Sequence, residues 1–247
     1  MTEIIDETNT GQKPDAGGFM DGAKAILPLI AAVLPVGLVY GAVAAGKGLS
    51  VLEAALMSAL VFAGGSQFVA MDIWTHPASW AGLGFAALLV NVRHVLLSAS
   101  IGPKMTAFST PKKYASMLFL ADEIWAIAEM KAREARLTPA WFAGVVAPFY
   151  ASWVLSSVVG AIGGALLGDP ALVGLDFAFP AVFIVLIMNF WQGRRTGAVL
   201  LASAIAAIGV KSFTGGAWYI AAGALAGLAV AAFASQGEKT ENGETVE

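Results

Sequence analysis

Three groups of polar side chains interrupt apolar stretches of this 247-residue chain. One group contains Asn91, Arg93 and His94, which lie inside the apolar run 80–101. Placing an arginine at the centre of a membrane-spanning helix costs roughly 2.5 to 3.5 kcal/mol, so such a residue is expected to have a function and a partner. A guanidinium pairs best with a carboxylate, to which it can donate two parallel hydrogen bonds. The predicted partner of Arg93 is therefore a carboxylate, either of a ligand or of the chain itself.

The second group is Asp122 and Glu123, near the middle of the apolar segment 114–130. An acid at this depth needs a counter-charge or a proton. Two interpretations remain open. Either the acids hold the ammonium of a substrate or a coupling proton, or one of them forms a structural ion pair with Arg93.

The third group is Gly64, Gly65, Ser66 and Gln67, inside the apolar run 51–74. Two adjacent glycines followed by two hydrogen-bonding side chains indicate a broken helix. A break at membrane depth leaves backbone amides and carbonyls free, and transporters use such groups to hold anionic substrate groups and coupling cations. The alternative is a packing contact between small residues within one continuous helix.

The composition argues against enzymatic and metal chemistry. The chain has two histidines and no cysteine, which excludes disulfides, thiolate metal sites and cysteine nucleophiles. His94 and Ser98 share one helical face, but this spacing alone does not build an oxyanion hole. A net charge of -3 with scattered basic residues is not the pattern of a nucleic-acid-binding protein. We predict no catalytic residue, no metal, no cofactor and no nucleic-acid partner.

The elements that position these groups are predicted to be membrane helices. Hydrophobic residues make up 58% of the chain and charged residues only 13%, whereas a soluble domain has about 25% charged residues. The mean hydropathy is +0.75. We therefore predict an all-α integral membrane protein with about seven transmembrane helices in the lipid bilayer. The expected spans are 25–45, 51–74, 80–101, 141–167, 175–191, 198–210 and 216–234.

A single transmembrane domain, residues 24–235, is expected between disordered polar tails at 1–23 and 236–247. The acidic segment 114–130 has basic residues on both flanks. Because basic residues gather on the cytoplasmic side, this pattern favours a re-entrant segment over an additional span.

Glycine spacing suggests helix packing and a weak internal repeat. Gly37 and Gly41 are four residues apart, a spacing that lets another helix approach closely. Gly160 and Gly164 repeat this spacing later in the chain. With three spans before the second unit, the two units would have opposite orientations, as in an inverted repeat.

Four blocks of sequence contain the polar groups and one further stretch. They are AGGSQF at 63–68, NVRHVL at 91–96 with SAS at 98–100, ADE at 121–123, and GLDFA at 174–178 with PAVF at 180–183. Together they resemble the AzlC family of branched-chain amino-acid permeases. The resemblance implies a multi-pass protein of the bacterial inner membrane that exports valine, leucine, isoleucine or, in some members, methionine. It also implies a small membrane partner subunit of the AzlD type.

Two positions depart from the family blocks, which typically have threonine at the position of Ala121 and often tyrosine at that of Leu97. These departures leave the choice of substrate open. The predicted substrate-binding residues are Gly64, Gly65, Ser66, Gln67, Asn91, Arg93, His94, Asp122 and Glu123.

Our hypothesis is a secondary transporter for small apolar amino acids that works by alternating access. Arg93 would bind the substrate carboxylate or lock the closed state, with Gln67 and Asn91 lining the path. Asp122 or Glu123 would bind the substrate ammonium or a proton. The alternatives from other classes are a non-transporting scaffold subunit, whose polar groups only hold helices together, and a channel for small solutes.

Overall fold

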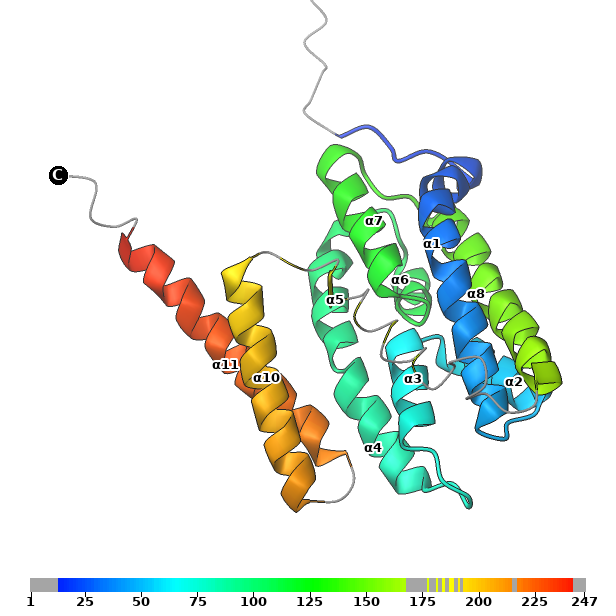
Figure 1. Ribbon diagram of the computed structural model, residues 1–247. Coiled ribbons are helices and arrows are strands. Elements are labelled where there is room, and N and C mark those ends of the chain that lie inside the picture. Colours follow the sequence, from blue (N-terminus) through cyan, green and yellow to red (C-terminus); the bar gives the residue numbers. More distant parts are fainter. Residues whose placement is uncertain are drawn as a thin grey trace, which may run out of the picture.

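The computed structural model describes residues 13–167, 177, 181, 184, 187–188, 191, 193–214 and 217–241, and every regular element in this part of the chain is a helix (Figure 1). The predicted all-helical class is therefore confirmed. The helices are α1 (Phe19–Gly46), α2 (Val51–Val61), α3 (Gly64–Asp72), α4 (Trp80–Asn91), α5 (Arg93–Ile101), the short 3-10 helix η1 (Gly102–Lys104), α6 (Thr110–Met117), α7 (Asp122–Glu134), α8 (Pro139–Leu167), α10 (Arg194–Phe213) and α11 (Trp218–Glu241).

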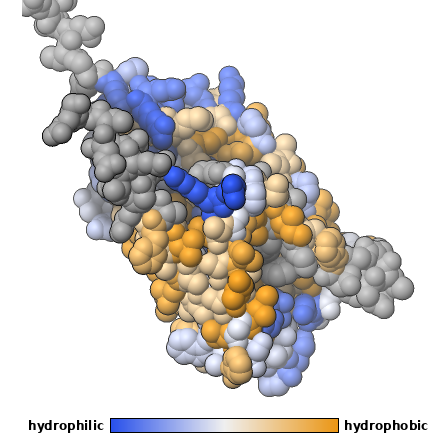
Figure 2. Space-filling view, turned by 60° about the vertical axis from the view of Figure 1, so that its left-hand side comes forward, coloured by the Kyte–Doolittle hydropathy of each residue, from blue (hydrophilic) through white to orange (hydrophobic). Residues whose placement is uncertain are grey.

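Four stretches in the described residues are long and apolar enough to cross a membrane: α1, the nearly continuous run from α4 to η1, α8 and α10. The apolar part of α11, Trp218–Phe233, is shorter. On the face drawn in Figure 2, apolar residues gather in a band between mostly hydrophilic ends, as expected for a surface that meets lipid. The predicted span 175–191 lies mostly outside the described residues.

Helices α1 and α8 lie side by side at one edge of the bundle and pack with glycines between them (Figure 1). A Cβ atom at Gly41 would lie 2.0 Å from the carbonyl oxygen of Ser157, and one at Gly160 would lie 2.1 Å from the carbonyl oxygen of Leu38. No side chain fits at these distances, so the two backbones touch directly. The close approach of another helix that the Gly37–Gly41 spacing predicts is confirmed.

Helices α2 and α3 form a hairpin that enters and leaves the bundle at one end. The Ser50 hydroxyl begins α2 by accepting a hydrogen bond from an amide of its first turn. The helix stops at Phe62, whose φ of 41° is left-handed, and α3 begins beyond Ala63. The outer ends of the hairpin are joined, because His76 Nε2 lies 2.9 Å from the carbonyl oxygen of Lys47.

The helix break expected near Gly64 is therefore present, but the predicted span 51–74 is wrong. The break turns the chain back instead of letting it continue in the same direction. With a rise of about 1.5 Å per residue, each arm is about 14 to 17 Å long, roughly half of a 30 Å hydrocarbon core. The tip of this hairpin therefore lies near the middle of the bundle.

Helices α6 and α7 form a second hairpin from the opposite end, which agrees with the predicted re-entrant segment. Residues 118–121 separate the two helices, and neither helix reaches the length of a span. Lys112 and Lys113 lie in α6 near its outer end, and Lys131 and Arg133 lie in the last turns of α7. Both ends of this hairpin are thus basic and lie on one side.

The first hairpin also changes the direction of α8. Because the chain turns back there, two spans rather than three precede α8, so α8 runs in the same direction as α1 (Figure 1). A Cβ at Gly22 would meet the Trp141 carbonyl near one end of this pair, and a Cβ at Gly41 would meet Ser157 near the other. The predicted opposite orientation of the two glycine-containing units is therefore wrong. These glycines face one shared interface, and no repeat is evident in the described residues.

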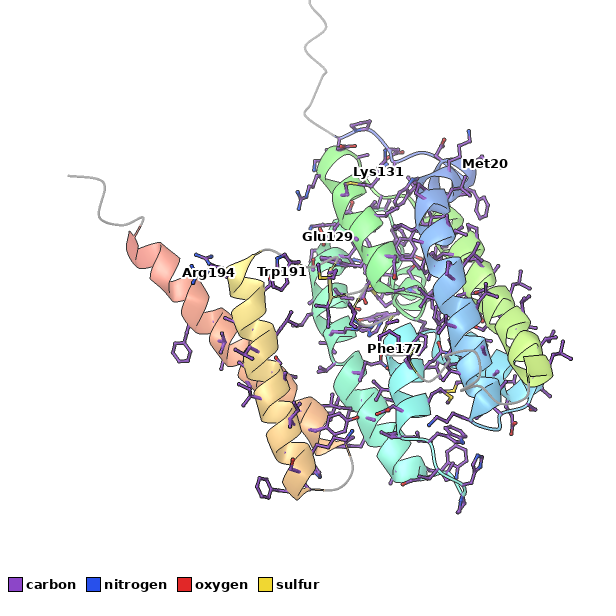
Figure 3. All side chains as sticks on the ribbon, viewed as in Figure 1. Met20, Glu129, Lys131, Phe177, Trp191 and Arg194 are labelled. Carbon is purple, nitrogen blue, oxygen red and sulfur yellow. The ribbon has the colours of Figure 1, made fainter. Side chains whose placement is uncertain are left out.

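Basic residues gather at one end of the bundle. In Figure 3, Lys131 in the last turn of α7 lies at the same end of the bundle as Met20 at the start of α1, and Arg194 begins α10 at its upper end. The opposite end carries Lys47, after α1, and Lys211, in the last turn of α10. By the positive-inside rule, we expect the upper end in the figures to be cytoplasmic.

Residues 13–18 have defined structure, although the sequence assigned them to a disordered tail. The Arg136 amide donates to the carbonyl of Pro14, and its carbonyl accepts from the amide of Ala16, both at 2.8 Å. Arg136 Nε donates to Asp15 Oδ1, also at 2.8 Å. At the other end of the chain, α11 continues to Glu241, beyond the expected boundary at 235. Residues 1–12 and 242–247 lie outside the described residues.

The Asp15–Arg136 ion pair should make this attachment depend on pH. The side-chain hydrogen bond from Arg136, supported by its charge, lowers the pKa of Asp15 from its usual 3.8. A carboxyl group whose pKa is lower in the folded state than in the unfolded state stabilises the folded state at neutral pH. This stabilisation is lost as the pH falls through the lowered pKa. We expect Asp15→Asn to speed hydrogen exchange of the Ala16 amide at neutral pH. This difference from wild type, corrected for intrinsic exchange, should shrink and disappear as the pH falls below the usual carboxyl value of 3.8 and through the lowered pKa of Asp15. A difference that persists in acid would contradict the assignment.

Candidate functional site

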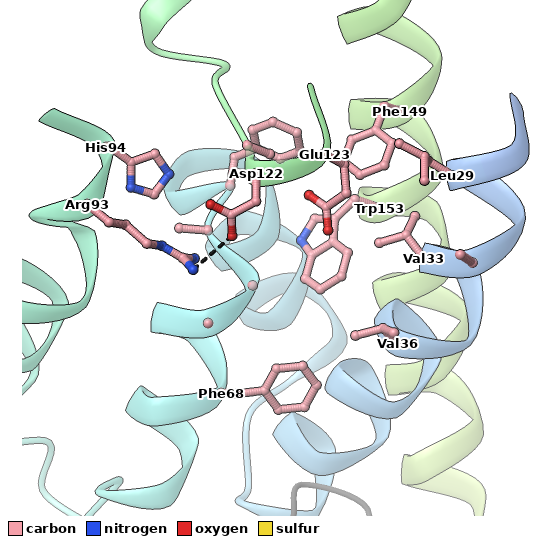
Figure 4. Close-up of a pocket in the computed structure, with 16 residues that line it drawn as sticks. Leu29, Val33, Val36, Phe68, Arg93, His94, Asp122, Glu123, Phe149 and Trp153 are labelled. Atoms are coloured by element: carbon pink, nitrogen blue, oxygen red, sulfur yellow. Dashed lines mark ion pairs between the residues drawn. The ribbon is translucent and has the colours of Figure 1, made fainter. Parts of the chain in front are cut away.

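A cavity of ≈ 270 Å³ lies where the two hairpins meet α1, α5 and α8 (Figure 4). The hairpins touch beside it, because the ring centroids of Phe62 and Phe119 are 6.5 Å apart. The residues that line the cavity are Leu29, Ala32, Val33, Val36, Phe62, Ala63, Gly64, Gly65, Phe68, Arg93, His94, Ala121, Asp122, Glu123, Phe149 and Trp153.

Arg93 begins α5 just after an interruption between α4 and α5. The Val95 amide donates to the Val92 carbonyl at 3.1 Å, one residue closer than in a regular α-helix. The Asn91 carbonyl lies instead 3.2 Å from His94 Nδ1. A carbonyl can only accept, so Nδ1 carries the proton in this contact. The contact between His94 and the Asn91 carbonyl thus stabilises the break between α4 and α5, where Arg93 lines the cavity.

Arg93 forms an ion pair with Asp122 at the polar end of the cavity. Arg93 Nη1 lies 2.8 Å from Asp122 Oδ2, and the two side chains are 42% and 36% exposed. Arg93 Nε is buried and has no hydrogen-bond partner. Gly65 leaves room for the guanidinium, because a Cβ there would lie 3.3 Å from Nη2. Asp122 therefore leaves at least one Arg93 donor unused.

The first turn of α3 faces the same polar end. Its N-cap residue, Ala63, makes no side-chain cap, and the turn contains no acidic residue. The first amides of a helix have no partner within the helix, and the helix dipole favours an anion beside them. Gly64 and Gly65 bring this backbone to the cavity wall. Together with Arg93, the turn forms a site suited to a carboxylate.

Asp122 and Glu123 form the first turn of α7, the second helix that begins at the cavity. Acidic residues stabilise a helix N-terminus through its dipole, which helps explain why α7 begins here. Glu123 points toward the middle of the cavity, between Asp122 and the apolar wall (Figure 4). Among the described residues, Asp122 pairs with Arg93 and Glu123 makes no ion pair.

The wall opposite Arg93 is apolar. Spacings of three or four residues place its members on one face of α1 and one face of α8. Phe68 of α3 lies below them (Figure 4). The cavity thus has a charged end and an apolar side. The wall residues are Leu29, Ala32, Val33 and Val36 from α1, and Phe149 and Trp153 from α8.

Gln67 lies behind the cavity wall, although the sequence hypothesis placed it along the path. Its side chain is completely buried. Gln67 Nε2 donates to Ser58 Oγ at 3.2 Å, and Oε1 accepts from Trp153 Nε1 at 3.0 Å. Both ends of the amide are therefore engaged by the protein, and Gln67 reaches the cavity only through Trp153.

Six of the nine predicted site residues line the cavity, and three lie behind it. Ser66 Oγ donates to Asn91 Oδ1 at 2.8 Å, which ties α3 to the end of α4. The lining residues are Gly64, Gly65, Arg93, His94, Asp122 and Glu123, and those behind the wall are Ser66, Gln67 and Asn91.

The apolar residues that line the cavity were not among the site residues predicted from the sequence. In a membrane helix, apolar residues face lipid, a neighbouring helix or a cavity, and the pattern does not separate these cases. The aromatic pair Phe149 and Trp153 at helical spacing was the one available hint. The structure identifies these residues because α8 packs against α1 at the level of the hairpin tips.

A second polar cluster joins α5 to α7 nearer the basic end of the bundle. Glu129 accepts hydrogen bonds from Ser100 and Lys104 and forms an ion pair with Lys104. Ser100 follows Arg93 by seven residues, and Glu129 follows Asp122 by seven. The two helices therefore face each other along two successive polar contacts.

Residues 28–167 match the model of the family described as AzlC protein. This match covers more than half of the chain and contains all nine predicted site residues. The chain belongs to the AzlC family. The resemblance drawn from the four sequence blocks is thereby confirmed.

This AzlC-family chain is 33% identical over 210 residues to the inner membrane protein YgaZ of Escherichia coli (strain K12), covering 81% of this chain and 84% of YgaZ. It is 29% identical over 190 residues to an uncharacterized membrane protein of Archaeoglobus fulgidus, covering 76% and 83% of the two chains. It is also 29% identical over 171 residues to the branched-chain amino acid transport protein AzlC of Bacillus subtilis (strain 168), covering 68% and 66%. No solved structure matches the chain. The predicted multi-pass location in the inner membrane is confirmed.

Proposed function

We propose that this protein transports branched-chain or similarly small apolar amino acids, with the cavity between the hairpin tips as its binding site. The main support is that one cavity combines an arginine, two acids and an apolar wall. A zwitterionic amino acid carries the complementary set: a carboxylate, an ammonium and an apolar side chain. The name of the Bacillus subtilis relative points to the same class of substrate.

The substrate carboxylate binds Arg93 and the free amides at the start of α3. The substrate ammonium binds Glu123, which makes no ion pair in the described residues, or Asp122. When the site is empty, Asp122 compensates the charge of Arg93 at 2.8 Å. The same pair can therefore neutralise the site between transport cycles, and the substrate competes for it.

The apolar wall contributes to substrate affinity but does not determine the direction of transport. Burying apolar substrate surface against it yields about 25 cal/mol per Å². A volume of ≈ 270 Å³ lies just below the roughly 300 to 1,000 Å³ of pockets for drug-sized ligands, as suits a single amino acid. Export as the direction of transport, and a small AzlD-type partner subunit, are part of the proposal and rest on the family resemblance.

Ligand-induced thermal stabilisation of the purified protein in lipid nanodiscs tests the proposed recognition. We expect L-leucine and L-valine, but not L-glutamate, to raise the unfolding temperature. Leucinamide lacks the carboxylate and N-acetyl-leucine lacks the ammonium. Each loses a charge-assisted hydrogen bond worth about 1.5 to 3 kcal/mol, so both should bind at least about tenfold more weakly than leucine. Equal stabilisation by all these compounds would refute the proposal.

Flux from liposomes separates transport from the alternative functions. Liposomes should contain either this chain alone or this chain with an AzlD-type subunit. Saturable leucine flux in either preparation supports a transporter. Flux that rises linearly with leucine concentration indicates a channel, and absence of flux from both indicates a scaffold.

A further inference from the structure

We propose that Trp153 sets the upper size limit for the amino-acid side chain, and that Gln67 is the positioning residue that holds Trp153 in place. This inference rests on the proposed function, because it concerns the apolar part of the same cavity. Trp153 lines the cavity, whereas Gln67 is buried behind it. A buried amide with both ends engaged cannot bind the substrate, so its effect on transport must pass through the indole.

Two side chains, Gln67 and Tyr40, hold the indole in one orientation. Its Nε1 donates to Gln67 Oε1 at 3.0 Å, and Gln67 is in turn fixed by Ser58. The Tyr40 ring stacks on the indole, with centroids 6.1 Å apart and an interplanar angle of 22°. All of these side chains are buried, with Trp153 only 4% exposed.

Gly64 brings the backbone of α3 against the far edge of the same ring. A Cβ at Gly64 would lie 3.0 Å from Trp153 Cη2, closer than nine in ten real Cβ contacts. The indole is therefore enclosed by a hydrogen bond, a stacked ring and a glycine backbone. A wall held this firmly cannot move aside for a longer substrate, so it acts as a fixed stop for the side chain.

Trp153→Phe tests the size limit by removing the outer part of the wall. A change of about one methylene in an apolar pocket alters discrimination by about 10- to 200-fold. We expect the ratio of phenylalanine to valine binding affinity to rise at least about tenfold in this variant. Trp141→Phe is the matched control, because Trp141 is a buried tryptophan of the same helix that does not line the cavity. Its ratio should equal that of wild type.

Gln67→Leu tests the positioning role and does not depend on the folding of the first variant. A freed indole should admit phenylalanine, so the ratio of phenylalanine to valine affinity rises, while alanine binds as in wild type. A uniform loss of affinity for alanine, valine and phenylalanine would overturn the inference, because it would mean that Gln67 serves the common head group.

Different results would refute the proposed function and the role of Trp153. A wild-type protein that binds no amino acid refutes the proposed function, and this inference with it. A wild-type protein that binds valine, with an unchanged ratio in folded Trp153→Phe and Gln67→Leu, refutes only the role of Trp153. Size-exclusion profiles and unfolding temperatures establish which variants are folded. If Trp153→Phe is not, the ratio in Gln67→Leu decides.

Discussion

Arg93→Ala should abolish most valine and leucine transport while leaving the protein folded. The variant removes the cation that binds the substrate carboxylate and leaves Asp122 without its 2.8 Å partner. Truncating one partner of a buried, hydrogen-bonded charge pair costs about 2 to 5 kcal/mol, and the 42% exposure of Arg93 favours the lower end. We therefore expect substrate affinity to fall at least about tenfold, measured by radiolabelled valine binding and by efflux from loaded cells.

A purely structural ion pair is the rival explanation for Arg93, and a charge exchange separates the two. The double variant Arg93→Asp with Asp122→Arg restores opposite charges at the same two positions. A structural pair would then regain both unfolding temperature and transport. A carboxylate site would regain stability without transport, because the cation now lies at the start of α7, away from the α3 amides. Arg136→Ala is the matched control, since Arg136 pairs with Asp15 outside the cavity.

Gly160→Ala should prevent the folded bundle from accumulating, whereas Gly163→Ala on the same helix should have little effect. A Cβ at Gly160 would lie 2.1 Å from the backbone oxygen of Leu38, and backbone cannot move aside like the end of a flexible side chain. A Cβ at Gly163 meets nothing within 4 Å. Overpacking typically costs about 1 to 3 kcal/mol, and a direct backbone clash lies at the upper end or beyond.

The yield of monodisperse protein and the unfolding temperature measure this difference. In an ordinary helix, alanine is about 1 kcal/mol more favourable than glycine, so Gly163→Ala should be neutral or slightly stabilising. The same unfolding temperature for both variants would mean that α1 and α8 are not in direct backbone contact.

The polar groups of the site were predictable because the rest of the chain is so apolar. In a soluble protein Arg93, Asp122 and Glu123 would be three charges among many. Here each carries an insertion cost that something must offset, and the pairing of Arg93 with Asp122 is one of the two interpretations that the sequence left open. Their assignment to a substrate stays a prediction.

The course of the first hairpin was not predictable in the same way. The run 51–74 has the length of a span, and only the direction of the chain after the break distinguishes a span from a hairpin. That direction depends on the left-handed conformation of Phe62 and on the contact between His76 and Lys47, which are far apart in sequence. The second hairpin was predictable because its basic flanks gave the sidedness of both ends.

Gln67 shows a different limit of sequence reasoning. A polar residue beside two glycines in an apolar run has the composition of a binding site. Its actual partners, Ser58 and Trp153, lie 9 and 86 residues away. Which polar residue faces a ligand and which holds a neighbour is decided by tertiary packing, and sequence periodicity does not report it.

The meeting of the two hairpin tips divides the permeability barrier of the membrane into two layers in series. The α2–α3 hairpin reaches about half of the 30 Å hydrocarbon core and the α6–α7 hairpin does not cross it, so a solute in the cavity is separated from each aqueous compartment by one layer. Displacing the α2–α3 layer would connect the cavity to one compartment while the α6–α7 layer still insulates the other. A leak would require both layers to open at once, and the Phe62 and Phe119 rings, with centroids 6.5 Å apart, lie where the two layers meet.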